Sequence, residues 1–160
     1  MDPAILDTQA IFDKFPEEPA LKALSELTVA AKYDREELTV TVARENIIAA
    51  CEAIKKAGYN FLEDVTAVDW YPSEPRFQIT YSILSIPLKR RLRITVRLAG
   101  DDAAIDSITS VWPSANFYER EVFDLFGVHF GGHPNLRRIM MPEDWQGHPL
   151  RKDYPVEGYR

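Results

Sequence analysis

The chain has 160 residues, of which 46% are hydrophobic and 28% charged, and these values suit one soluble globular domain with a sizeable core. Its single cysteine, Cys51, excludes an intrachain disulfide, and no apolar run approaches the roughly 20 residues that a membrane-spanning helix needs. The first residues lack the basic and apolar regions of a secretory signal, so we expect a cytoplasmic protein.

The N-terminal region is predicted to form two short helices and a hairpin. Ala4–Phe15 has apolar residues at helical spacing, and Glu17–Glu26 can form a second short helix. Leu27–Tyr33 and Leu38–Val42 alternate apolar and polar residues, and the polar segment Asp34–Glu37 between them suits a turn.

A longer helix is predicted over Arg44–Ala57, and Gly58 fits the position that follows a helix. Its apolar residues share one stripe, made of Ile47, Ile48, Cys51 and Ile54. Because Cys51 lies on this stripe, we interpret it as a core residue and not as a reactive thiol.

Three strands joined by short turns are predicted next, over Phe61–Trp70, Arg76–Leu84 and Leu88–Leu98. The second and third alternate cleanly between apolar and polar residues, which is typical of strands with one buried face. We therefore expect an antiparallel meander whose inner face packs on helices.

Basic residues are concentrated in this meander although the net charge of the chain is −6. Residues 76–100 contain no acid and the following bases: Arg76, Lys89, Arg90, Arg91, Arg93 and Arg97. Like charges on alternate residues of one strand repel each other, so acidic groups should lie nearby. Two interpretations remain open, a solvated sheet face and a docking face for an acidic partner.

Another helix is predicted from about Phe117 to Phe126, after a looser segment, Asp101–Trp112, that could include a short helix. Asn116 and Glu119 have the spacing of a capping box, and Gly127 suits the end of the helix.

Glu119 has an unusual place on this helix, because it projects from the middle of the apolar arc. Three other charged residues of the helix fall on the opposite side: Arg120, Glu121 and Asp124. A buried carboxylate without a partner costs several kcal/mol or takes up a proton, so we expect a cation beside Glu119. Three later arginines could supply it: Arg137, Arg138 and Arg151. We interpret the pair as structural, and a catalytic acid is the alternative.

The chain changes character at residue 129, where glycines and prolines become frequent and no helical or strand period remains. We expect an α+β domain over residues 1–128, with an antiparallel or mixed sheet packed on helices in two layers, and an extended C-terminal arm over residues 129–160. The arm keeps spaced apolar residues, so it should lie on a surface, either of this domain or of another protein.

Two segments of the arm resemble each other. Gly132-His133-Pro134-Asn135-Leu136-Arg137-Arg138 is followed by Gly147-His148-Pro149-Leu150-Arg151-Lys152, and each combines a glycine turn, a histidine before a proline, a leucine and a basic pair. The similarity is either coincidental turn chemistry or a pair of docking points that present cations to an acidic surface.

Motifs for ligands and catalysis are missing from the sequence. It contains no GxGxxG, P-loop, nucleophile elbow or CxxC motif, and aromatic residues do not alternate with the basic strand as a nucleic-acid platform requires. The glycines between His129 and His133 argue against a helical metal site. We therefore expect no cofactor, metal or nucleic acid on this chain.

The segment Glu119–Met140 resembles the signature of the 30 kDa subunit family of respiratory complex I, whose bacterial members form the C subunit of NADH-quinone oxidoreductase. That pattern is Glu-Arg-Glu, an acid three residues later followed by two apolar residues, then His, Arg and two apolar residues. It is matched here by Glu119-Arg120-Glu121, Asp124, Leu125-Phe126, His133, Arg137 and Ile139-Met140. The segments Asp64–Asp69, Trp112–Tyr118 and Gly147–Pro155 are also similar to the family.

The resemblance implies a cofactor-free structural subunit of the peripheral arm of NADH:quinone oxidoreductase (complex I, NDH-1). Members of the family dock on the 49 kDa-type subunit (the D subunit) and support electron transfer from NADH to quinone, coupled to proton translocation. FMN and iron–sulfur clusters would belong to partner subunits, and the chain would lie on the cytoplasmic side of the inner membrane, reaching the membrane only through the complex. In that setting the docking residues would come from the signature and the two similar segments: Glu119, Arg120, Glu121, Asp124, His133, Arg137, Arg138, His148, Arg151 and Lys152.

Two alternatives remain. Related membrane-bound hydrogenases and other quinone-reducing dehydrogenases use equivalent subunits. A small acid–base enzyme using Glu119, His133 and His148 would instead require these side chains to converge on a pocket.

Overall fold

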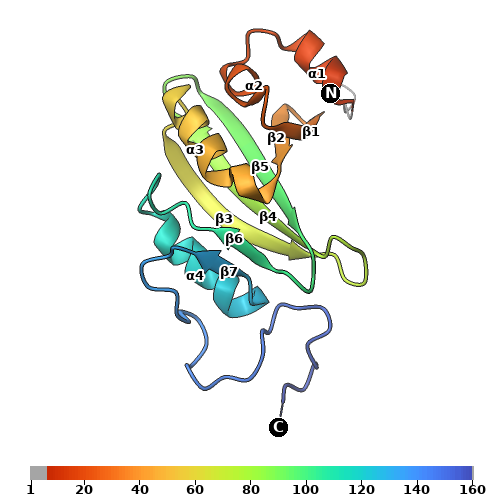
Figure 1. Ribbon diagram of the computed structural model, residues 1–160, viewed down its shortest axis with the longest axis vertical. Helices are drawn as coiled ribbons and strands as arrows, with labels where there is room; N and C mark the ends of the chain where they lie inside the picture. The colour runs from red at the N-terminus through yellow and green to blue at the C-terminus, as the bar shows by residue number, and fades with distance from the viewer. Residues whose placement is uncertain (1–6, 160) are drawn as a thin grey trace.

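A five-stranded mixed sheet organises the fold of the computed structural model, which describes residues 7–159 (Figure 1). Its strands are β1 (Thr28–Asp34), β2 (Glu37–Val42), β3 (Phe61–Asp69), β4 (Phe77–Ser85) and β5 (Arg90–Leu98). The strand order is β1-β2-β5-β4-β3, in which β2 and β5 are parallel and all other neighbours are antiparallel. The predicted hairpin and meander are both confirmed, and the parallel pair joins them into one sheet.

The helix that connects the hairpin to the meander crosses the inner face of the sheet. It consists of a short 3-10 turn, η1 (Arg44–Asn46), and α3 (Ile47–Lys56), and it buries the predicted stripe. Cys51 is fully buried, and burial raises the pKa of its thiol, which confirms its assignment to the core.

Two short helices cover the hairpin end of the sheet, α1 (Thr8–Lys14) and α2 (Pro19–Leu24). Both were predicted, although residues 4–6 of the first prediction lie outside the described residues. The Thr8 hydroxyl accepts a hydrogen bond from the N–H of Ala31 in β1 at 2.9 Å.

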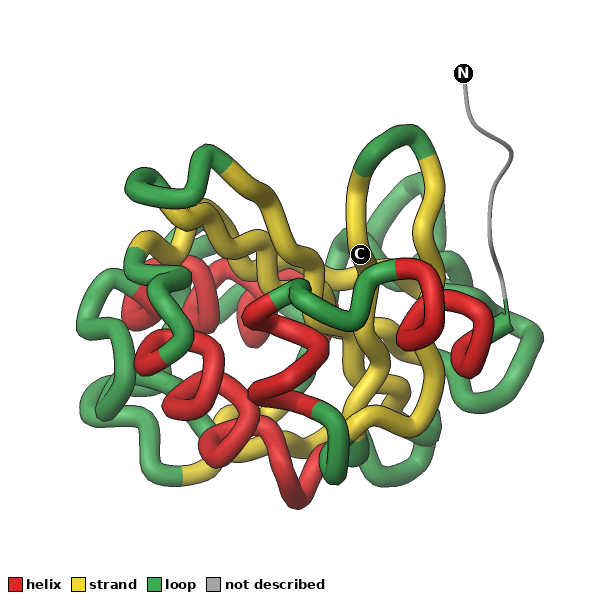
Figure 2. Tube along the Cα trace, turned by 90° about the horizontal axis from the view of Figure 1, so that it is seen from above, coloured by secondary structure: helices red, strands yellow, loops and turns green. Residues whose placement is uncertain are grey.

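A second, two-stranded sheet lies beside α4 (Ala115–Phe126) and consists of β6 (Ala104–Asp106) and β7 (His129–Gly131), which run parallel. The proposed short helix in 101–112 is therefore wrong, because pairing with β7 supplies the backbone hydrogen bonds of this segment instead. The same pairing makes His129–Gly131 a strand, although the sequence assigned it to the irregular arm. Figure 2 shows the helices and the two sheets from above.

The apolar core lies between the inner face of the large sheet and the helices. On the outer face, the predicted cationic ladder meets acids of this same chain, because Arg91 pairs with Glu63 at 3.4 Å and Arg93 pairs with Glu37. Arg97 donates to the Pro75 carbonyl at 2.6 Å. The expectation of nearby acids is therefore confirmed without a partner protein.

Candidate functional site

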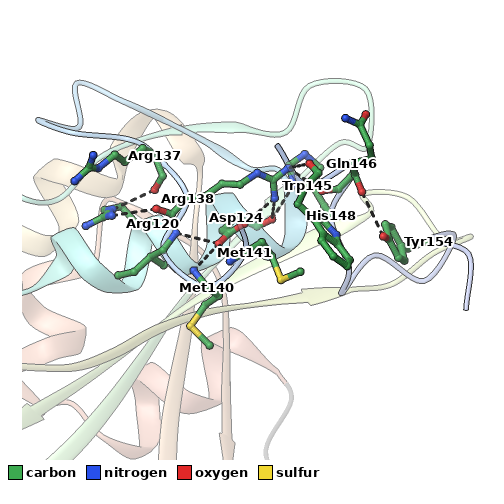
Figure 3. Close-up of polar contacts among 12 residues, drawn as sticks. Arg120, Asp124, Arg137, Arg138, Met140, Met141, Trp145, Gln146, His148 and Tyr154 are labelled. Atoms are coloured by element: carbon green, nitrogen blue, oxygen red, sulfur yellow. Dashed lines mark hydrogen bonds and ion pairs between the residues drawn. The ribbon is translucent and has the colours of Figure 1, made fainter. Parts of the chain in front are cut away.

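The arm that follows β7 wraps around the C-terminal end of α4, and Asp124 holds its first turn (Figure 3). The Asp124 carboxylate is fully buried. Its Oδ1 pairs with Nη1 of Arg138 at 2.7 Å. Its Oδ2 accepts the N–H groups of three successive residues, Ile139 at 3.0 Å, Met140 at 2.7 Å and Met141 at 2.8 Å. One side chain thereby fixes the backbone of four successive arm residues.

Asp124 keeps its charge in this buried place. Burial alone would raise the pKa of its carboxyl, but the N–H of Met141, the Arg138 guanidinium and the N–H groups of Met140 and Ile139 together hold that pKa below its usual value. Each donor stabilises the ionised form, so the carboxylate is a permanent anchor at neutral pH.

Arg138 extends this anchor to the next part of the arm. Its Nη2 donates to the carbonyls of Trp145 at 3.0 Å and Gly147 at 2.9 Å, while Nη1 remains on Asp124 (Figure 3). Arg120, one turn earlier on α4, supports the same turn by donating to the carbonyls of Arg137 and Arg138, each at 3.1 Å. The segment from Arg138 to Gly147 is therefore a loop closed by one guanidinium.

The second part of the arm satisfies the last carbonyls of α4. A helix leaves its final four C=O groups without partners inside the helix. Here the carbonyls of Asp124, Leu125 and Phe126 accept from His148 Nδ1 at 2.9 Å, Leu150 N at 3.0 Å and Arg151 Nε at 2.6 Å. The Phe123 carbonyl accepts from Gly127 N at 2.8 Å. The arm thus acts as the cap of α4.

Gly127 makes this close approach possible. Its φ of 73° lies in the left-handed region, and a Cβ there would lie 2.6 Å from Cδ2 of His148 and 2.7 Å from Nη2 of Arg151. Glycine is therefore required both by the backbone and by the side chains that lie over it.

A further anchor, missed by the sequence analysis, attaches the end of the arm to the large sheet. Asp69 at the end of β3 and Asp153 of the arm both bind Arg76, with Nη2 at 2.8 Å from Asp69 Oδ2 and 2.6 Å from Asp153 Oδ1. Asp69 Oδ2 also accepts the N–H of Lys152 at 2.8 Å. The Phe77 ring lies between two guanidiniums, with those of Arg76 and Arg151 at 4.9 and 5.2 Å from its centroid.

Asp69 is strongly biased toward its charged form. Burial alone would raise the pKa of its carboxyl, but Arg76 and the N–H groups of Lys152 and Tyr71 lower it to about 2. A signal for this anchor was present, because Val65, Ala67 and Asp69 share the inward face of β3 and an inward carboxylate needs a partner.

Glu119 has a different partner from the one expected. The carboxylate is fully buried, as predicted, but no arginine reaches it. It accepts from the Ser107 hydroxyl at 2.6 Å and from Ile108 N at 2.8 Å, in the loop after β6. Burial raises the pKa of Glu119 to about 7 despite these two hydrogen bonds. The predicted ion pair between helix and arm exists, but Asp124 forms it.

The proposed capping box also fails. The helix begins at Ala115, so Asn116 lies inside its first turn, and Glu119 turns toward the core instead of back to the helix start. The loop after β6 attracts this carboxylate, and a local motif cannot reveal such a long-range contact.

His133 closes the start of the arm over α4. Its side chain is fully buried, and its Nε2 lies 3.1 Å from the Asn116 carbonyl and 3.8 Å from Glu119 Oε2. Its Nδ1 accepts the N–H of Asn135 at 3.0 Å, so Nε2 carries the proton and donates to Asn116. The two arm histidines therefore both hydrogen-bond carbonyls of α4, His133 near its start and His148 near its end.

The two basic pairs of the arm are each divided between this domain and the surface. Arg138 and Arg151 turn inward and bind α4, whereas Arg137 and Lys152 are exposed. Glu121 is also exposed, on the outer side of α4. Four apolar residues of the arm remain at the surface as well: Ile139, Met140, Trp145 and Leu150.

The structure does not assemble the site that an acid–base enzyme would need. Glu119 and His133 lie together in the core, but His148 lies at the other end of α4. The largest cavity found in residues 7–159 lies near the β1–β2 turn and is lined by none of these three residues. Within the same range, no helix is long and apolar enough to cross a membrane.

Comparison with known proteins gives consistent matches. Residues 40–160 match the family described as respiratory-chain NADH dehydrogenase, 30 Kd subunit. The C subunit of NADH-quinone oxidoreductase from Geobacter sulfurreducens is 53% identical over 126 residues, covering 78% of each chain. Its counterpart from Roseiflexus castenholzii is 41% identical over 137 residues, covering 84% of this chain and 79% of that one.

Two solved structures share the fold. A trypsin-resistant fragment of Nqo5 has a TM-score of 0.65 and 31% identity, covering 78% of this chain and 98% of that one. A chain of an archaeal respiratory membrane complex, the membrane-bound sulfane sulfur reductase, has a TM-score of 0.76 and 26% identity, covering 88% and 86%. The α+β architecture agrees with the Nqo5 fragment.

Proposed function

Because the chain belongs to the family of the 30 kDa subunit of the respiratory-chain NADH dehydrogenase, we propose that it is a structural subunit of the peripheral arm of NADH-quinone oxidoreductase. Its C-terminal arm docks on the 49 kDa-type subunit, and the chain itself carries no redox cofactor. In this role the whole complex transfers electrons from NADH to quinone, coupled to proton translocation, at the cytoplasmic side of the membrane.

The observation that carries the docking proposal is the two-sided character of the arm. One side is committed to α4 and the sheet through Asp124, Arg138, Arg151 and the Asp69–Arg76–Asp153 cluster. The other side leaves Met140 64% and Leu150 51% exposed, together with Ile139 and Trp145. Exposed apolar residues on a segment whose backbone is already fixed are typical of a preformed protein interface.

The signature residues then have two different roles. One group shapes the arm through contacts inside this chain, and it consists of Arg120, Asp124, His133, Arg138, His148 and Arg151. Glu121, Arg137 and Lys152 remain exposed and are the charged residues that the partner would contact. Exposed charges at the rim of an apolar patch steer association more than they add affinity.

Substitution of one exposed apolar residue tests this proposal. Met140→Asp should reduce the amount of 49 kDa-type subunit that co-purifies with this chain at least tenfold, because a charge at an apolar interface must be desolvated. Val29→Asp on β1 is the matched control, since Val29 is 67% exposed and lies outside the arm. Equal co-purification of the two variants, with unchanged melting temperatures, would contradict docking through the arm.

A second candidate function follows from the archaeal neighbour. Its likeness over 88% of this chain supports an equivalent subunit in another membrane-bound respiratory complex. The masses of the proteins that co-purify with the tagged chain distinguish the two assemblies, because only one of them contains an NADH-binding partner.

A further inference from the structure

The largest cavity found in the described residues lies at the end of the large sheet that is away from the arm (Figure 1). It has a volume of about 880 Å³ and is enclosed by three segments: the α1–α2 connection, the β1–β2 turn and the start of β5. Its floor includes Tyr59, which is 1% exposed and donates to Glu18 at 2.6 Å. Phe15 and Tyr33 form one wall, with their ring centroids 4.6 Å apart.

The backbone of this cavity is unusual. Among residues 7–159, only Arg35, Glu36 and Lys89 combine a side chain with a positive φ, at 52°, 64° and 52°, and all three line the cavity. A left-handed backbone disfavours residues other than glycine, and asparagine–glycine is the usual choice for a turn like that at residues 35 and 36. Long charged side chains held in such positions are typical of binding sites.

The charges around the cavity leave a cationic surplus. Three of its four acids are already paired, Glu17 with Lys22, Glu18 with Arg90 and Glu37 with Arg93. Arg35 and Lys89 are exposed, and no carboxylate of residues 7–159 lies within ion-pair distance of either of them. Glu36 is the one lining acid without a partner in this part of the chain. On a body with a net charge of −6, this corner is distinctly basic.

We propose that this cavity is a second docking point, in which Arg35 and Lys89 receive an acidic peptide segment of another subunit of the same assembly. The aromatic wall and the partly buried Tyr59 and Glu18 supply apolar contact and hydrogen bonding beside the cations, the combination that specific interfaces use. The protein then connects two neighbours, one through the arm and one through the opposite end of its sheet. The inference rests on the proposed function only in taking its partner from that complex.

Site-specific photocrosslinking in the intact complex tests the two docking points separately. A benzoylphenylalanine is placed at Glu36, on the rim of the cavity, or at Met140, on the arm. Crosslinks from position 36 should reach a peptide of another subunit that is rich in Asp and Glu. Lys89→Glu should lower their yield at least fivefold, because it replaces an attracting charge with a repelling one.

Lys56→Glu is the matched control, since Lys56 is an exposed lysine at the end of α3 that does not line the cavity. The inference is overturned if position 36 forms no crosslink, reaches only a neutral or basic peptide, or responds equally to both substitutions. Crosslinks from position 140 report on the arm alone, so their loss counts against the proposed function and not against the cavity.

Discussion

The Asp124 carboxylate and the Arg138 guanidinium meet at 2.7 Å in the interior, beneath the first turn of the C-terminal arm. Asp124 belongs to α4 and Arg138 to the arm, so this ion pair joins a regular element to a segment with little secondary structure. Removing one partner from a buried pair costs more than the pair itself contributes, because the other charge is left without compensation.

Asp124→Asn should therefore destabilise the isolated chain by about 3–5 kcal/mol. The amide keeps the shape of the side chain, but one of its ends must now present N–H groups either to Arg138 or to the backbone N–H groups of the arm. Urea unfolding measures the loss. Glu121→Gln, an exposed change on the same helix, should stay within about 0.5 kcal/mol of the parent, and a similar stability of the two variants would refute the anchor.

Gly127→Ala should release the second part of the arm. Gly132→Ala is a close control, because Gly132 has almost the same φ, 74°, but a Cβ there meets no atom within 4 Å. Both substitutions carry the backbone cost of about 1–2 kcal/mol, and only Gly127→Ala also collides with His148 and Arg151. Limited trypsin digestion should cut after Arg151 or Lys152 faster in Gly127→Ala alone. Equal rates in both variants would mean that the arm does not rely on this contact.

Acid should weaken the attachment of the arm to the sheet. The folded pKa of Asp69, about 2, lies below its ordinary value of 3.8. The stabilisation by this carboxylate is therefore complete above the ordinary value and disappears as the pH falls through about 2. The difference corresponds to roughly 2 kcal/mol. Unfolding free energies measured between pH 5 and pH 2 should fall less steeply for Asp69→Asn than for the parent, and parallel curves would exclude Asp69 as a source of acid sensitivity.

Glu119 should have the opposite pH dependence. Burial raises its folded pKa to about 7 from an ordinary value of 4.5, so folding is favoured while the group is protonated and loses this advantage as the pH rises through 7. A neutral glutamine can still accept from Ile108 N and donate to Ser107. Glu119→Gln should therefore gain up to about 3 kcal/mol relative to the parent between pH 5 and pH 8. A constant difference over that range would show that Glu119 stays ionised.

The regular part of the fold was predictable because local patterns determine it. The alternation in β4 and β5, the stripe on α3 and the break after Phe126 each reflect a period or a glycine within a few residues. The errors concern long-range partners. The β6–β7 pairing joins residues about 25 positions apart and converted an expected helix and the start of the arm into strands.

The charged residues show the same division. The sequence correctly indicated one ion pair between α4 and an arginine of the arm, but assigned it to Glu119, because Asp124 falls on the polar side of the wheel. Asp124 is buried only because the arm covers it, and the wheel of a single helix cannot include a covering segment. The cluster of Asp69, Arg76 and Asp153 joins three separate segments and gave only an indirect sign of itself, an inward-facing acid in β3.

The loop from Met141 to Gln146 is tied at both of its ends by contacts that do not depend on its own peptide bonds. Arg138 and Asp124 retain the segment before it, while His148, Arg151 and Asp153 retain the segment after it. A chain cleaved once inside this loop would consequently stay together as two fragments, and residues 147–160 supplied as a separate peptide could restore a truncated protein.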